Sequence, residues 1–221
     1  MQGELEQALG RLYGTAVQAA GAGRTDAGVH ASGQVVHFDP PRAIPPEGVR
    51  AALNSMLVSD VRVLAAWTVP PGFDARRSAR SKRYRYRLAW GSPLDPWEGL
   101  RTWVLPTSPE RSLVGAALAL VVGKHDFASF ALSGHAGTGR RGTVRIVTSA
   151  RLAIRGRHAS IVIEGEGFLR GMVRRIVGAL VEVGRGAQPI DWFTGLLDDP
   201  STRPPAPTAP AHGLTLERVC Y

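Results

Sequence analysis

The segment at residues 82–90, Lys-Arg-Tyr-Arg-Tyr-Arg-Leu-Ala-Trp, alternates between two kinds of side chain. Because successive side chains of a β-strand point to opposite faces of a sheet, Tyr84, Tyr86 and Leu88 share one face, and the three arginines between them share the other. The segment is therefore predicted to be a strand in a sheet with two different faces. Considered alone, Tyr84 is a half-buried sheet residue of high β-propensity.

The hydrophobic periodicity of the remaining chain predicts an α+β protein. Helices are expected around Leu5, Leu9 and Leu12 and at residues 47–57, 111–122, 169–183 and 190–197. Strands are expected at residues 15–20, around Val36, and at 61–69, 82–90, 144–154, 158–164 and 214–221. Prolines at 93, 96 and 106 mark a crossing between two halves, which places the expected domains at residues 1–92 and 105–221.

The loop at residues 21–31, Gly-Ala-Gly-Arg-Thr-Asp-Ala-Gly-Val-His-Ala, holds one carboxylate, Asp26, among small residues. Its glycines permit backbone angles that are closed to other residues and let the backbone of a ligand come close. Arg24 adds a cation two residues before the carboxylate, and the strand expected near Val36 would anchor the loop. Loops of this kind often carry function. Taken by itself, an Asp in this context is at least as often a turn or cap residue.

The charge of the chain indicates a polyanionic partner. Its 221 residues include 27 Lys and Arg against 18 Asp and Glu, which gives a formal net charge of +9. Nearly all of these cations are arginines, whose planar guanidinium groups suit phosphate oxygens and stack on bases. Nucleic acid is therefore the leading candidate, although genome composition explains the choice of Arg over Lys equally well.

The same composition argues against several other classes of protein. Cys220 is the only cysteine, which excludes a disulfide framework and a cysteine-based zinc site, and the histidines lack metal-ligand spacing, so no metal is predicted. No apolar run approaches the length of a membrane span, and the chain begins in an amphipathic helix instead of a signal peptide. A cytoplasmic protein without a membrane partner is expected.

A further arginine stands out on the helix expected at residues 169–183. Arg174 lies on the side of this helix opposite to the apolar stripe that includes Met172 and Ile176, so it faces away from the main core. Gly178, one turn later, leaves room for a second layer to approach and bring an acid to the guanidinium. The residues alone leave open that Arg174 is solvated or contacts phosphate.

Several segments resemble, in the same order, motifs of the tRNA pseudouridine synthase A family. The most specific is Arg-Thr-Asp-Ala-Gly-Val-His-Ala at residues 24–31. The others are Phe-Asp-Ala-Arg at 73–76, Lys-Arg-Tyr-Arg-Tyr at 82–86, Gly-Lys-His-Asp-Phe-Ala-Ser-Phe at 123–130, Gly-Phe-Leu at 167–169, Met-Val-Arg-Arg-Ile-Val-Gly at 172–178 and Ala-Pro-Ala-His-Gly-Leu at 209–214. The resemblance thus runs through nearly the whole chain.

This resemblance implies an isomerase that converts uridines 38, 39 and 40 in the anticodon stem-loop of tRNA to pseudouridine, without a cofactor. It also implies two related α+β halves that share one mostly antiparallel sheet with a central cleft, and a homodimer. In such a site Asp26 is the catalytic carboxylate and Arg174 pairs with it. The resemblance further implies that Tyr84 stacks on the target base, that Arg24 helps to displace this base from the RNA helix, and that Leu214 lines the uracil pocket.

The chain departs from the family pattern in two places. Family members usually open with a strand and a Gly-Trp-Gln loop before the segment that matches residues 1–6, so the fold is expected to lack its first strand, through a misannotated start or a genuine shortening. Gly171 stands where many relatives carry a His. Two rival functions follow: a non-catalytic tRNA-binding protein, if the shortening prevents a competent site, and a small-molecule enzyme that uses Asp26, which the charge disfavours.

Overall fold

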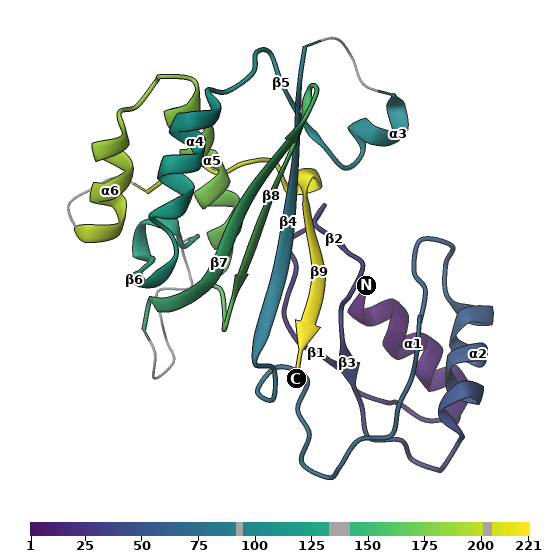
Figure 1. The fold of residues 1–221 in the computed structure, drawn as a ribbon. Helices are drawn as coiled ribbons and strands as arrows, with labels where there is room; N and C mark the ends of the chain where they lie inside the picture. Colours follow the sequence, from purple (N-terminus) through teal and green to yellow (C-terminus); the bar gives the residue numbers. More distant parts are fainter. Residues whose placement is uncertain (92–94, 133–141, 201–204) are drawn as a thin grey trace. The chain divides into compact units, whose positions relative to one another are not determined.

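The computed structural model describes residues 1–91, 95–132, 142–200 and 205–221, which fold into two compact units. The first unit contains Met1–Arg24 and Gln34–Ala79, and the second contains Thr25–Gly33 and Arg80–Tyr221. Both combine helices and strands (Figure 1), so the predicted α+β class is confirmed. The loop that carries Asp26 belongs by its contacts to the second unit. The expected domain limits, residues 1–92 and 105–221, stay a prediction.

The core of the first unit lies between helices α1 (Gln2–Tyr13) and α2 (Pro46–Met56). Leu9 of α1 is fully buried, and Leu5 and Leu12 pack partly buried against the same cluster, as the predicted amphipathic face requires. Helix α1 ends at Gly14, which has a left-handed φ of 73° and donates its N–H to the carbonyl of Gly10.

The predictions of two strands in the first unit were largely wrong. Strands β1 (Ala20–Gly21) and β3 (Val36–His37) pair antiparallel, so only the end of the strand expected at residues 15–20 is paired, and residues 61–69 form no strand. Helix side chains take the place of a neighbouring strand. Glu6 accepts the N–H of Ala19, and Asn54 bonds both the N–H and the carbonyl of Val63. Apolar alternation does not reveal such side-chain partners.

The second unit is built on a mixed, mostly antiparallel sheet, as predicted. Its strands are β2 (His30–Ala31), β4 (Ser81–Trp90), β5 (Trp103–Leu105), β6 (Gly123–Asp126), β7 (Val144–Arg155), β8 (His158–Gly165) and β9 (Leu214–Cys220). They follow the order β2-β9-β4-β8-β7-β6, with β5 paired to β4. The β2–β9 and β4–β5 pairs are parallel, and the others are antiparallel.

Helices cover one face of this sheet (Figure 1). They are α4 (Arg111–Ala119), α5 (Met172–Gly184) and α6 (Ile190–Asp198), while the short helix α3 (Pro96–Gly99) and the 3-10 turns at Ala128–Phe130 and Ala211–Gly213 complete the unit. Tyr84, Tyr86 and Leu88 are buried, while the opposite face carries an ion pair between Arg83 and Glu164 at 2.8 Å. The predicted two-faced strand at residues 82–90 is therefore confirmed.

Two helix boundaries differ from the sequence prediction. Helix α4 ends at Ala119, before the expected residue 122, and strand β6 follows at Gly123–Asp126. The Asp126 carboxylate then accepts the N–H of Ala128. Helix α5 begins at Met172, three residues later than expected, after Gly171 with a φ of 71°. No helix of the described residues is long and apolar enough to cross a membrane.

Gly178 of α5 should be a position where alanine is harmful. A Cβ there would lie 2.1 Å from the carbonyl oxygen of Pro207, a backbone atom that cannot turn aside. Gly178→Ala should therefore lower the free energy of unfolding by roughly 1–3 kcal/mol despite the better helix propensity of alanine. Urea unfolding measures the change.

Gly115 of α4 provides the matched control, because a Cβ there meets nothing within 4 Å. Gly115→Ala should leave stability unchanged or raise it by up to about 1 kcal/mol. Equal effects of the two substitutions would contradict the close approach of the chain to α5.

Candidate active site

Asp26 lies at the start of a tight turn. The carbonyl of Asp26 accepts the N–H of Val29 at 3.0 Å, which closes a four-residue β-turn. Gly28, its third residue, has a φ of 81°, the conformation that a type II turn requires at that position and that glycine adopts without strain. A Cβ on Gly28 would also come within 3.3 Å of Ala211. The small residues seen in the sequence thus allow a close approach of two loops.

Strand β9 anchors this loop. His30 and Ala31 of β2 pair in parallel with Thr215 and Leu216, and the N–H groups of Ser32 and Gly33 then donate to the carbonyl of Leu216. The strand near Val36, which was expected to be the anchor, pairs instead with β1 in the first unit. A parallel partner so far along the chain leaves no local pattern in the sequence.

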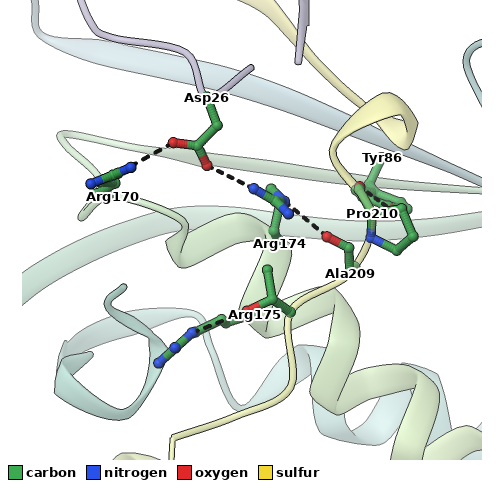
Figure 2. Close-up of polar contacts among 8 residues, drawn as sticks. Asp26, Tyr86, Arg170, Arg174, Arg175, Ala209 and Pro210 are labelled. Carbon is green, nitrogen blue, oxygen red and sulfur yellow. Dashed lines mark hydrogen bonds and ion pairs between the residues drawn. The ribbon is translucent and has the colours of Figure 1, made fainter. Parts of the chain in front are cut away.

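Two arginines hold the Asp26 carboxylate, one on each oxygen (Figure 2). Arg174 Nη1 lies 2.8 Å from Oδ2, and Arg170 Nε lies 3.5 Å from Oδ1. The Arg174 side chain is 16% exposed and that of Asp26 is 20% exposed, whereas Arg170 is 55% exposed. One contact is therefore short and largely shielded from solvent, and the other is long and open.

Arg174 donates in a second direction as well. Its Nε bonds the carbonyl of Ala209 at 2.8 Å, so one planar guanidinium joins the Asp26 loop to the segment before β9 (Figure 2). Gly178 makes room for this segment, as the sequence predicted, although the approaching layer consists of Pro207 to Ala209 and the acid comes from elsewhere. A cation in the first turn of a helix opposes the helix dipole, and the carboxylate of Asp26 offsets this cost.

Arg175, the next residue, fastens the same segment from another side. Its Nη1 donates to the carbonyl of Ala131 at 2.7 Å, and its Nε lies 3.3 Å from Oγ1 of Thr208. Burial lowers the pKa of this guanidinium from its usual value. Farther along, the hydroxyl of Tyr86 donates to the carbonyl of Pro210 at 2.8 Å (Figure 2). The segment that leads into β9 is thus held at three successive residues, by the hydroxyl of Thr208 and by the carbonyls of Ala209 and Pro210.

Tyr84 lies in an apolar environment beside the carboxylate. Its ring meets Phe168 edge-on, with centroids 5.1 Å apart, and it stands opposite Leu216 in the β4–β9 register. Burial raises the pKa of Tyr84 to about 12, and the negative charge of Asp26 acts in the same direction. The phenol therefore stays protonated at neutral pH.

Four of the five site residues named from the sequence, Asp26, Arg174, Tyr84 and Leu214, lie in the second unit. Asp26 contacts Arg174 directly and its charge acts on Tyr84, whereas Leu214 is buried and stands opposite Tyr86. Arg24 belongs to the first unit and is exposed, and its role stays a prediction.

The sequence reasoning missed Arg170 and Phe168 as neighbours of the carboxylate and of Tyr84. Both lie within or next to the Gly-Phe-Leu segment at residues 167–169, and Arg170 also stands four residues before Arg174, which is the spacing of one helix face. Within the described ranges, no three His, Cys, Asp or Glu side chains gather closely enough to hold a metal ion. The chemical groups of the site are thus one carboxylate, its two guanidinium partners and a neutral phenol.

The sequence comparisons point to one class of protein, the tRNA pseudouridine synthases. The sequence model of the family with that description matches residues 117–221, which lie in the second unit.

Curated relatives match the chain over its whole length. A Myxococcus xanthus protein named tRNA pseudouridine synthase A is 41% identical over 224 residues, which cover 100% of this chain and 83% of that protein. A Desulfotalea psychrophila protein named tRNA pseudouridine synthase A 1 is 38% identical, and the match covers 100% of this chain and 90% of that protein. A Geobacter sulfurreducens protein named tRNA pseudouridine synthase A is also 38% identical, and the match covers 100% of this chain and 89% of that protein. The chain therefore belongs to the tRNA pseudouridine synthase A family, as its motifs predicted.

The raised pKa of Tyr84 has a measurable effect on stability. An exposed tyrosine titrates near pH 10, so the folded protein holds an extra proton between about pH 10 and 12. The stability from this group is complete below about pH 10 and is lost as the pH rises toward 12. Tyr84→Phe should therefore show a shallower fall in unfolding free energy above about pH 10, measured by urea unfolding.

The flattening should be partial, because burial also raises the pKa of Tyr86. Identical slopes for Tyr84→Phe and the parent protein would show that Tyr84 titrates alike in the folded and unfolded chains.

Proposed function

We propose that this chain isomerises uridine to pseudouridine at positions 38, 39 and 40 in the anticodon stem-loop of tRNA. The observation that carries the proposal is the Asp26 carboxylate, tied to Arg174 at 2.8 Å, in a chain that matches its family over the full length. The formal net charge of +9 supports a polyanionic substrate.

The reaction exchanges one bond of the ribose for another. The bond between C1′ and N1 of the uridine breaks, the uracil turns in place, and a bond between C1′ and C5 replaces it. Asp26 acts in one of two ways. As a nucleophile it bonds to C1′ while uracil leaves with the electron pair of the broken bond, and C5 later displaces the carboxylate. As a base it removes the C2′ proton, so that a C1′–C2′ double bond forms as uracil leaves, and it returns this proton to C2′ when C5 bonds to C1′. In both, C5 finally loses a proton and N1 gains one.

The other residues of the site hold the reactants. Arg174 orients Asp26 through a bond that the Ala209 carbonyl keeps in place. Tyr84 stacks on the detached base as a neutral phenol, with Phe168 supporting its ring. Leu214 lines the uracil pocket, and Arg24 helps to displace the target base from the RNA helix, a step that costs a few kcal/mol.

Three broader features complete the proposal. Two related α+β halves share one continuous sheet with a cleft across it, the active form is a homodimer, and the protein works in the cytoplasm on tRNA. The mostly antiparallel sheet of the second unit and the family relationship support the first of these features.

Asp26→Asn is the decisive variant, because it removes the charge and keeps the shape of the side chain. Pseudouridine formation on tRNA should fall by at least about a thousandfold. The dissociation constant for tRNA should change by less than about threefold, since the carboxylate contributes no attraction to phosphate. Asp198→Asn, an exposed position at the end of α6, is the control and should retain full activity.

Measurements of tRNA binding and of pseudouridine formation with the parent protein distinguish the rival functions. Binding of tRNA without product would favour a non-catalytic RNA-binding protein, and indifference to tRNA would favour a small-molecule enzyme. Product formation by Asp26→Asn at more than a trace of the parent rate would remove Asp26 from the catalytic role.

Arg174→Ala should lower kcat about a hundredfold and change KM little, because displacement of a reacting group by about 1 Å has that order of effect. Arg174→Lys should recover only part of the loss, since an ammonium lacks the planar fork that reaches both Asp26 and Ala209. Steady-state kinetics with tRNA as the varied substrate measures both constants. A raised KM with unchanged kcat would instead make Arg174 an RNA contact.

A further inference from the structure

The two oxygens of the Asp26 carboxylate are held very differently. Oδ2 accepts a 2.8 Å bond from Arg174, whose guanidinium is also fixed by Ala209. Among the described residues, Oδ1 is contacted only by the Nε of Arg170, and 3.5 Å is long for a charged hydrogen bond. Within the part of the chain that the structure describes, this is the one polar contact of the Arg170 guanidinium. The carboxylate thus has one fixed oxygen and one loosely covered oxygen.

This difference bears on which oxygen reacts, provided that Asp26 acts as in the proposed function. Each carboxylate oxygen keeps a lone pair beside a single hydrogen bond, so access decides which of them attacks C1′ or accepts the C2′ proton. Arg174 is only 16% exposed and is bonded on two sides, so it stays on Oδ2. Arg170 is 55% exposed, and only its side chain has to turn for Oδ1 to become accessible. Oδ1 is therefore the more accessible of the two oxygens.

The backbone of Arg170 stays fixed during such a movement. Its carbonyl accepts the N–H of Leu132 at 2.9 Å, and Gly171 follows in a left-handed conformation. A Cβ on Gly171 would lie 2.4 Å from the side chain of Leu132, so this close contact depends on the glycine. Because the pivot is fixed, the guanidinium stays close to Asp26 when it leaves Oδ1.

We propose that Arg170 exchanges the Asp26 carboxylate for a phosphate of the target nucleotide when tRNA binds. A ribose whose C1′ or C2′ reaches Oδ1 carries a phosphate on each side, so an anion enters the site as the carboxylate oxygen is released. The guanidinium fork fits phosphate oxygens in pairs, and such charge-assisted bonds are stronger than a long, exposed ion pair. Arg170 thus covers Oδ1 in the free protein and binds RNA in the complex.

The test neutralises the phosphate and the arginine separately and together. Two tRNAs carry a single uncharged methylphosphonate linkage, one on the 5′ side and one on the 3′ side of the target uridine. With the parent protein, one of the two should lower kcat/KM about tenfold relative to unmodified tRNA. Arg170→Ala should lose about tenfold on unmodified tRNA and suffer no further loss with that linkage. Arg170→Lys should retain most of the parent's sensitivity, since lysine also binds phosphate.

Arg185→Ala is the matched control, because Arg185 and Arg170 flank the two ends of helix α5. Arg185 is 57% exposed and pairs with Glu182, so it resembles Arg170 in exposure and pairing but lies at the far end of α5. It should show the same methylphosphonate penalty as the parent protein. In a second readout, the slope of log affinity for tRNA against log salt should become shallower by about 0.7–0.9 in Arg170→Ala.

The outcomes distinguish this inference from the proposed function. An active parent with a full methylphosphonate penalty in Arg170→Ala, or with no penalty at either linkage, would overturn the role of Arg170 alone. A parent that makes no pseudouridine on unmodified tRNA would overturn the proposed function, and the exchange with it.

Discussion

The bond between Arg174 and the Ala209 carbonyl is the interaction on which the site depends. Without it the guanidinium would be a mobile cation, and its pairing with Asp26 would cost side-chain entropy each time it formed. With it, one planar guanidinium bonds two segments that are far apart in the sequence and fixes their spacing. Arg175 and Tyr86 secure the neighbouring carbonyl and hydroxyl groups of the same segment. The Asp26 carboxylate is therefore held in position partly by groups that do not contact it themselves.

Local patterns in the sequence were sufficient to predict the helices and strands that have one apolar face and one polar face. The strand at residues 82–90 and the helix around Arg174 both follow from side-chain periodicity, because burial of one face is decided within a few residues. The space beside Gly178 could also be predicted, since a missing side chain on a helix surface is visible in the sequence.

Contacts between distant segments could not be predicted in this way. The anchoring of the Asp26 loop on β9 depends on parallel pairing, which has no turn signal. The segment at residues 61–69 looks like a strand because it is extended, but its backbone partner at Val63 is the amide side chain of Asn54. Arg170 stands four residues before Arg174 and fell within the helix expected at residues 169–183, but α5 begins only at Met172, so Arg170 approaches Asp26 from a loop. In each case the decisive partner is chosen by tertiary structure.

The pairing of β2 with β9 also sets the order in which this protein can become active during its synthesis. Residues 30 and 31 leave the ribosome long before residues 214–220, which are the strand they pair with. Until β9 emerges, the loop with Asp26 has no neighbour on its β2 side, and the Ala209 carbonyl that fixes Arg174 is also missing. A nascent chain therefore carries its arginines before the Asp26 loop has its anchor on β9, and the site assembles only when residues 30 and 31 pair with residues 215 and 216.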